Sequence, residues 1–115
     1  MIAIRNLSTR RIGTAVFKKL YSKIFGEKFE LSLVIAGAKL MRDLNKKYRG
    51  EDKTANTLSF LLLRGRRGEI FLNSLERNLP RLFVHSALHL LGFDHKTKKR
   101  ARLMERKELI ILQSQ

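Results

Sequence analysis

The chain has 115 residues, 43% of them hydrophobic, and its 25 lysines and arginines against 10 acidic residues give a formal net charge of +15. This length and composition predict a single domain over residues 1–115 and exclude a disordered or fibrous protein. No apolar run approaches the roughly 20 residues of a membrane span. The chain also has no cysteine, which excludes disulfides and thiolate zinc sites, so we expect a soluble, cytoplasmic protein.

The first half of the chain predicts two strands that alternate with two helices. Residues 2–7 indicate a short strand, and Ser8 or Thr9 can cap the helix that follows. The apolar stripe of this helix would comprise Ile12, Val16, Leu20 and Ile24. Residues 29–35 alternate with the period of a half-buried strand. A second helix, ending at Gly50, is predicted from the spacing of Leu40, Met41, Leu44 and Tyr48.

The second half predicts a hairpin and two helices. Residues 56–63 and 69–72 flank the turn at 65–68, so they should pair as antiparallel strands. From Pro80 to Leu91 the chain is apolar on nearly every face, which indicates a central helix. A last helix is predicted over 97–112, and the residues on its inward face would be Ala101, Met104, Leu109 and Leu112. This order predicts an α+β domain with a mixed, mostly four-stranded sheet.

All three histidines lie within eleven residues, at His85, His89 and His95. On a helix, His85 and His89 share one face with their Cβ atoms about 5–6 Å apart. Gly92 allows a left-handed turn that would return His95 to the same ion. Three neutral imidazoles and one vacant position are typical of a catalytic zinc, here one ion per chain. The alternative is a set of histidines that only favour the helix dipole.

The histidine spacing also occurs in zinc proteases of the metzincin type. Those enzymes place a glutamate directly after the first histidine as the general base, whereas this chain has Ser86 there. Because a serine does not take a proton from zinc-bound water at neutral pH, a zinc protease is the weakest of the candidate functions.

The positive charge predicts a nucleic-acid partner, and the alternative is a solvated basic surface. Basic residues gather in two places, one being the predicted hairpin turn and the other the segment after the last histidine. They are Arg64, Arg66 and Arg67 in the turn, and Lys96, Lys98, Lys99, Arg100 and Arg102 in the segment. The second group would draw phosphates toward the metal.

The segment from His85 to His95 resembles the signature H-G-x-L-H-L-x-G-[YF]-D-H of the YbeY family, bacterial endoribonucleases of ribosomal RNA maturation. Its fixed positions match except the glycine, which is Ser86 here. Residues 44–49 and 56–60 are similar to the family's L-N-x-x-[YF]-R and T-[DN]-V-L-S-F blocks, and residues 68–70 to its G-[DE]-I strand. The resemblance spans most of the chain, from about Phe29 to the last helix.

The chain departs from the family pattern at several places. Ala55 stands where the family usually has threonine, Thr57 where it has valine and Ser86 where it has glycine. Ser86 adds a side chain beside the first ligand, so the packing there must have adjusted. Residues 73–82 form a short connection from the last predicted strand to the histidine helix, where the family usually carries a longer segment. The resemblance therefore predicts that a wall of the substrate cleft is missing.

The resemblance implies a zinc-dependent, single-strand-specific endoribonuclease whose substrate is a ribosomal RNA precursor, and it leaves open whether ribosomal proteins contribute. Arg49 matches the family's functional arginine and would hold the scissile phosphate; the alternative is a solvated arginine at a helix end. Asp94 would either fix the tautomer of a ligand histidine or cap a turn. Asn56 and Ser59 are weaker candidates for lining the cleft.

A second hypothesis is a noncatalytic RNA-binding factor of ribosome assembly, in which zinc only steadies the loop. The shortened segment before His85 motivates it. Three imidazoles would also bind nickel or copper, so the residues alone leave the native metal open.

Overall fold

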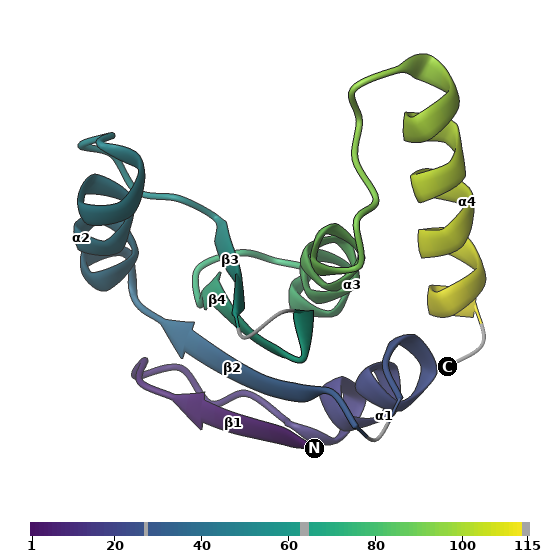
Figure 1. The fold of residues 1–115 in the computed structure, drawn as a ribbon. Coiled ribbons are helices and arrows are strands. Elements are labelled where there is room, and N and C mark those ends of the chain that lie inside the picture. The colour runs from purple at the N-terminus through teal and green to yellow at the C-terminus, as the bar shows by residue number, and fades with distance from the viewer. Residues whose placement is uncertain (27, 63–64, 114–115) are drawn as a thin grey trace.

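Four strands form one mixed sheet in the order β1-β2-β4-β3 in the computed structural model of the chain, which describes residues 1–26, 28–62 and 65–113 (Figure 1). The strands are β1 (Ile2–Asn6), β2 (Glu30–Ala36), β3 (Thr57–Leu62) and β4 (Arg67–Asn73). The helices are α1 (Ala15–Ile24), α2 (Ala38–Arg49), α3 (Leu79–Leu90) and α4 (Lys98–Gln113). The predicted α+β class with a four-stranded sheet is confirmed.

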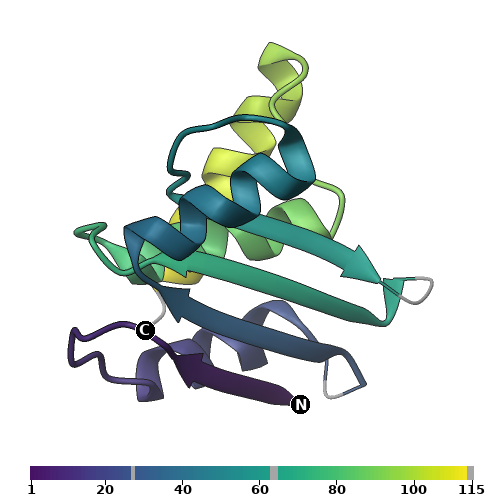
Figure 2. The same ribbon diagram turned by 90° about the vertical axis from the view of Figure 1, so that its left-hand side faces the viewer.

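The sheet is parallel except at one edge. Strand β2 pairs in parallel with both β1 and β4, whereas β3 pairs antiparallel with β4 and forms an edge (Figure 2). Thr57 lies opposite Leu72 and Leu62 opposite Arg67, which confirms the predicted hairpin. Leu63 and Arg64, which the prediction placed in the hairpin, lie outside the described residues.

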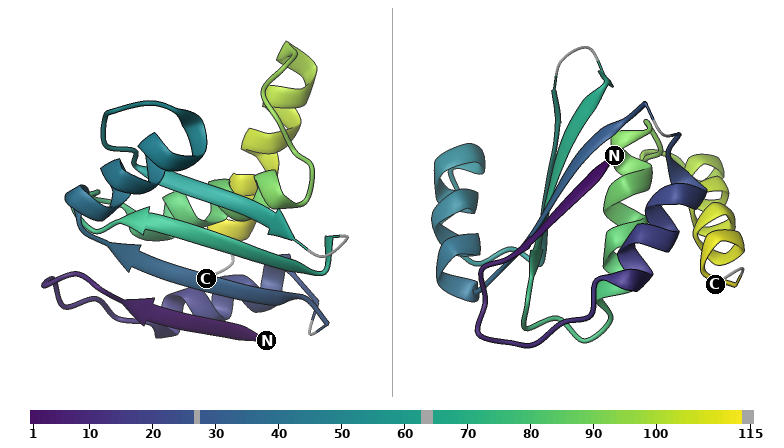
Figure 3. Two further views of the ribbon diagram at one scale, coloured as in Figure 1. Left: turned by 60° about the vertical axis from the view of Figure 1, so that its left-hand side comes forward. Right: turned by 90° about the horizontal axis from the view of Figure 1, so that it is seen from below.

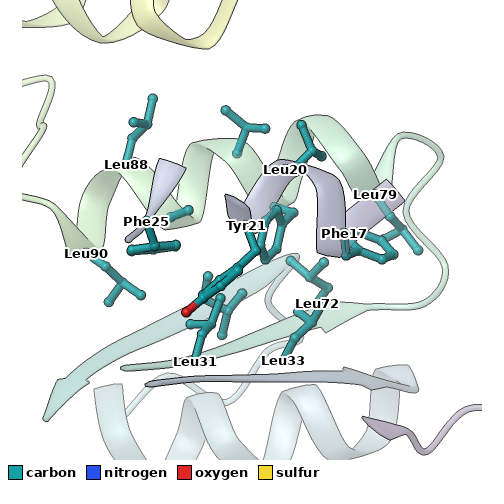
Figure 4. Close-up of a cluster of buried hydrophobic side chains, with 14 of the residues drawn as sticks. Phe17, Leu20, Tyr21, Phe25, Leu31, Leu33, Leu72, Leu79, Leu88 and Leu90 are labelled. Carbon is teal, nitrogen blue, oxygen red and sulfur yellow. The ribbon is translucent and has the colours of Figure 1, made fainter. Parts of the chain in front are cut away.

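The helices cover the two faces of the sheet unequally. Helices α1, α3 and α4 lie on one face and α2 on the other (Figure 3). The larger core fills the space between the sheet and the three helices, and its buried residues include Leu20, Leu33 and Leu88 (Figure 4). A smaller cluster under α2 contains Met41 and Leu58. Helix α3 contacts the sheet, α1 and α4, so the prediction of a central helix is confirmed.

Helix α1 begins later than the sequence predicts, and its buried face differs. The side chain of Asn6 accepts from the Ser8 amide at 3.0 Å and donates to the Arg10 carbonyl at 2.8 Å, which holds the chain after β1 in a turn. The helix starts at Ala15, so Ile12 precedes it. Its buried side chains are Phe17, Leu20 and Tyr21, while Ile12, Val16 and Ile24 are only partly buried.

The inward face of α4 also differs from the prediction. Met104, Glu108 and Ile111 are its buried residues, and Leu109, predicted to face inward, is 58% exposed. The contacts of α4 with α1 and α3 select one helical face, and Leu109 lies about 100° of helical rotation beyond Glu108. Leu91, the last residue of the apolar run that begins at Pro80, is 47% exposed, because the chain leaves α3 there.

Helix α2 ends where the sequence predicts. Gly50 caps it with a φ of 71°, a left-handed conformation that glycine adopts without strain. Among the described residues, no helix has the length and apolar character that crossing a membrane requires.

Candidate metal centre

Helix α3 carries two of the three histidines, and the turn after it carries the third. The side chain of Asn78 accepts from the Arg81 amide at 3.2 Å, which caps the start of the helix. At the other end Gly92 has a φ of 98°, as predicted, and Phe93 donates its amide to the Leu88 carbonyl at 3.0 Å. This turn reverses the chain and returns His95 to α3.

The structure brings the three imidazoles together. The ring centroid of His85 lies 4.7 Å from that of His89 and 5.0 Å from that of His95, and the His89 and His95 centroids are 5.3 Å apart. One nitrogen of each ring lies within 4.8 Å of the others. The Nε2 atoms of His85 and His89 are 3.1 Å apart, close to the roughly 3.3 Å between nitrogens bound to one tetrahedral zinc. The three rings could therefore hold a divalent cation.

The surroundings of His89 favour its neutral form. Burial lowers its pKa from the usual value, and the neighbouring His85 and His95 lower it further. Metals bind the neutral imidazole, so the ring is held in the protonation state that a ligand requires.

A glutamate of α4 orients the first histidine. Glu108, only 8% exposed, places Oε1 2.6 Å from Nδ1 of His85. When Nδ1 carries the proton and donates it to this carboxylate, the Nε2 lone pair is free to face the other two rings. Sequence reasoning missed Glu108. The available signal was an acidic residue four positions after Met104, in a helix whose charged residues are mostly basic.

Asp94 has the turn-capping role that was one of its two predicted alternatives. Its Oδ1 accepts from the Lys96 amide at 3.0 Å, and its Oδ2 accepts from the Arg100 guanidinium at 3.3 Å. The Lys96 amide is the main reason why the pKa of Asp94 lies below its usual value. Asp94 thus stabilises the turn that carries His95, whereas Glu108 contacts a ligand ring directly.

Two neighbouring hollows adjoin the cluster. The first, here called the histidine hollow, has a volume of about 740 Å³ and includes His85 and His95 in its lining. The second, here called the arginine hollow, has a volume of about 430 Å³ and includes Arg49. Asn56 and Glu76 line both, so the two hollows are contiguous.

Of the three predicted cleft residues, two line a hollow and the third lies elsewhere on the sheet. Arg49 lines the hollow beside the histidines rather than the one that contains them. Asn56 lies where the two hollows meet, whereas Ser59 lies on β3 and is not among the described lining residues of either.

Two departures from the family pattern contact each other. The hydroxyl oxygens of Thr57 and Ser86 are 2.6 Å apart, which links β3 to α3 at the residue that follows His85. Ser86 is buried, so its hydroxyl needs a partner inside the protein. Threonine in place of valine supplies that partner, which is how the packing beside the first ligand adjusts to the serine.

This pairing predicts a strong coupling between the two positions. Thr57→Val is expected to lower the free energy of unfolding by about 1–3 kcal/mol, because it leaves the Ser86 hydroxyl buried without its partner. Adding Ser86→Ala should recover much of that loss, since both partners are then apolar. A double-mutant cycle by urea denaturation measures the coupling. Losses that simply add, within about 0.3 kcal/mol, would show that the hydrogen bond contributes nothing.

Comparison with known proteins adds sequence evidence. A model of the family described as "Endoribonuclease YbeY" matches the chain in two overlapping segments, residues 3–72 and 65–115. A protein named Endoribonuclease YbeY from Neorickettsia sennetsu is 34% identical over 121 residues, which cover 90% of this chain and 85% of that protein. One from Pelotomaculum thermopropionicum is 31% identical over 134 residues, covering 96% and 88%.

A solved structure supports the fold. The solution structure of TM1509 from Thermotoga maritima superposes with a TM-score of 0.61 and covers 99% of this chain and 91% of that one. At 18% sequence identity, this likeness concerns the fold alone.

Proposed function

Since this chain belongs to the YbeY endoribonuclease family, we propose that it is a zinc-dependent endoribonuclease that cleaves single-stranded RNA in the maturation of ribosomal RNA. The observation that carries the proposal is the convergence of three imidazole nitrogens beside a hollow of about 740 Å³. The net charge of +15 supports binding of a polyphosphate chain.

The chain's own residues prepare the site for this chemistry. His85, His89 and His95 would hold the ion, and Glu108 keeps the Nε2 atom of His85 available to it. A zinc ion held by these residues would supply Lewis acidity, which would polarise a phosphoryl oxygen and lower the pKa of water toward neutrality. Ser86 contributes no base, because its hydroxyl is buried against Thr57. A zinc protease stays the weakest candidate, because the residue after the first histidine is a serine and not a glutamate.

Arg49 would bind the scissile phosphate. It is the last residue of α2, and its side chain is exposed in the hollow contiguous with that of the histidines. A guanidinium can donate two parallel hydrogen bonds to a phosphate and stabilise the charge that develops on its oxygens in the transition state.

The test compares cleavage of a single-stranded precursor ribosomal RNA by three proteins. Arg49→Ala is expected to lower kcat about 10²- to 10³-fold, the effect of removing one donor to a transition-state oxyanion. Arg5→Ala is the matched control, because Arg5 is an exposed arginine of β1 at the opposite edge of the sheet from β3. Its cleavage rate should stay close to that of the wild type. An unchanged rate in Arg49→Ala would remove this arginine from the mechanism.

The noncatalytic assembly factor is the second candidate function. Only residues 74–78 connect β4 to α3, where the family usually has a longer segment. The same assay separates the two candidates: an assembly factor binds the precursor RNA and leaves it intact with every metal supplied.

A further inference from the structure

We propose that Tyr48 is a stacking platform for one base of a single-stranded RNA, an inference that rests on the proposed function and names a substrate contact within it. Tyr48 belongs to the apolar stripe predicted for α2, yet it is 55% exposed. Tyr48 is not among the described lining residues of either hollow, but the next residue, Arg49, lines the arginine hollow. An accessible aromatic ring at this place offers the π-face on which an unpaired base stacks.

The ring of Tyr48 packs against another aromatic ring. Its centroid lies 5.1 Å from that of Phe60 on β3, at an interplanar angle of 58°. Phe60 in turn meets Phe71 on β4 nearly edge-on, with centroids 6.1 Å apart. These contacts restrict the Tyr48 ring before RNA arrives, so less side-chain entropy is lost on binding.

Cations surround the platform. Lys46, Lys47 and Arg49 occupy the last turn of α2. Nζ of Lys47 lies over the Tyr48 ring, 5.3 Å from its centroid, so a stacked base would displace this exposed ammonium from the ring face. The helix dipole alone would favour cations there. It does not account for the exposed aromatic ring among them, whereas a nucleotide requires both a stacking surface for the base and cations for the phosphates.

Tyr48 is connected to the histidines through its neighbour Arg49 and the two contiguous hollows. The next residue, Arg49, lines the arginine hollow, which meets the histidine hollow at Asn56, immediately before the edge strand β3. A strand that placed a phosphate at Arg49 could therefore place an adjacent base on Tyr48 and continue around the sheet edge to the metal ligands. Bases in a duplex are already stacked and paired, so this contact favours single strands.

The test measures binding of a short, fluorescently labelled single-stranded RNA by anisotropy, with gel analysis to confirm that it stays intact. Tyr48→Leu keeps an apolar contact with Phe60 but removes the π-face, and it is expected to weaken binding roughly 5- to 100-fold. Tyr48→Phe keeps the stacking surface and should bind within about twofold of the wild type. Leu109→Ala, a change of an exposed residue on α4, is the matched control and should leave binding unchanged.

A set of oligonucleotides, each with one abasic position, identifies the contact. With the wild type, one abasic position should weaken binding about as much as Tyr48→Leu does, and with Tyr48→Leu that penalty should disappear. Wild-type binding by Tyr48→Leu, or an abasic penalty that persists in it, would overturn the platform while leaving the nuclease proposal intact. If the wild-type protein itself bound no single-stranded RNA, the proposed function would fail together with the platform.

Discussion

His89→Ala is expected to abolish both metal binding and RNA cleavage. The Nε2 atom of His89 lies 3.1 Å from that of His85 in the three-histidine cluster. Removing the His89 ring leaves two protein nitrogens, whereas a catalytic zinc takes three protein ligands. Elemental analysis of untagged protein should find about one zinc per wild-type chain and little in the variant. Chelation of the wild type should stop cleavage in the same way, and added Zn²⁺ should restore it in the wild type alone.

Two further variants serve as comparisons for the metal content of His89→Ala. Asp52→Ala removes an exposed carboxylate that pairs with Arg42 on α2, and its metal content should equal that of the wild type. Glu108→Gln keeps all three ligands but weakens the contact that orients His85, so metal affinity should fall about 10- to 100-fold. Full metal content in His89→Ala would refute the three-histidine site.

Phe83→Ala is expected to lower the free energy of unfolding by about 3–5 kcal/mol. Phe83 is fully buried in α3 and meets Phe17 of α1 edge-on, with ring centroids 5.5 Å apart. Truncation removes this contact and leaves a cavity between the two helices, because their backbones cannot close around it completely. Such a loss is a large part of the 5–15 kcal/mol that stabilises a typical domain. Urea denaturation followed by circular dichroism measures it.

Leu109→Ala provides the matched control for Phe83→Ala. Leu109 is a large apolar residue of α4 that is mostly exposed, so its truncation should change the free energy of unfolding by no more than about 0.5 kcal/mol. A loss for Phe83→Ala as small as that of the control would show that α3 does not depend on the α1 contact. Because α3 carries His85 and His89, the Phe83 variant should also bind metal more weakly at denaturant concentrations where the wild type stays folded.

Patterns confined to short segments predicted much of the fold. The two segments that flank the turn at 65–68 indicated the β3–β4 hairpin, and Gly50 marked the end of α2. Pro80 and the apolar run after it located the central helix almost to the residue. Each of these features depends on backbone preferences and side-chain periodicity within one or two elements, which a sequence displays directly.

Features that depend on packing between distant segments escaped prediction. The inward face of α4 is set by its contacts with α1 and α3, which turn Glu108 inward and Leu109 out. Periodicity shows that a helix has an apolar side, but a stripe of mixed composition leaves its rotation undetermined by about one residue. That rotation decides which side chain reaches His85.

The amino-acid sequence by itself determined the grouping of the three histidines, since one helical turn and one glycine turn bring them together within eleven residues. Only the tertiary structure decided what surrounds them: Glu108 behind His85, Thr57 against Ser86, and Arg49 in the adjoining hollow. These neighbours come from α4, β3 and α2, and their positions follow from how the helices pack on the two faces of the sheet, which no local pattern encodes.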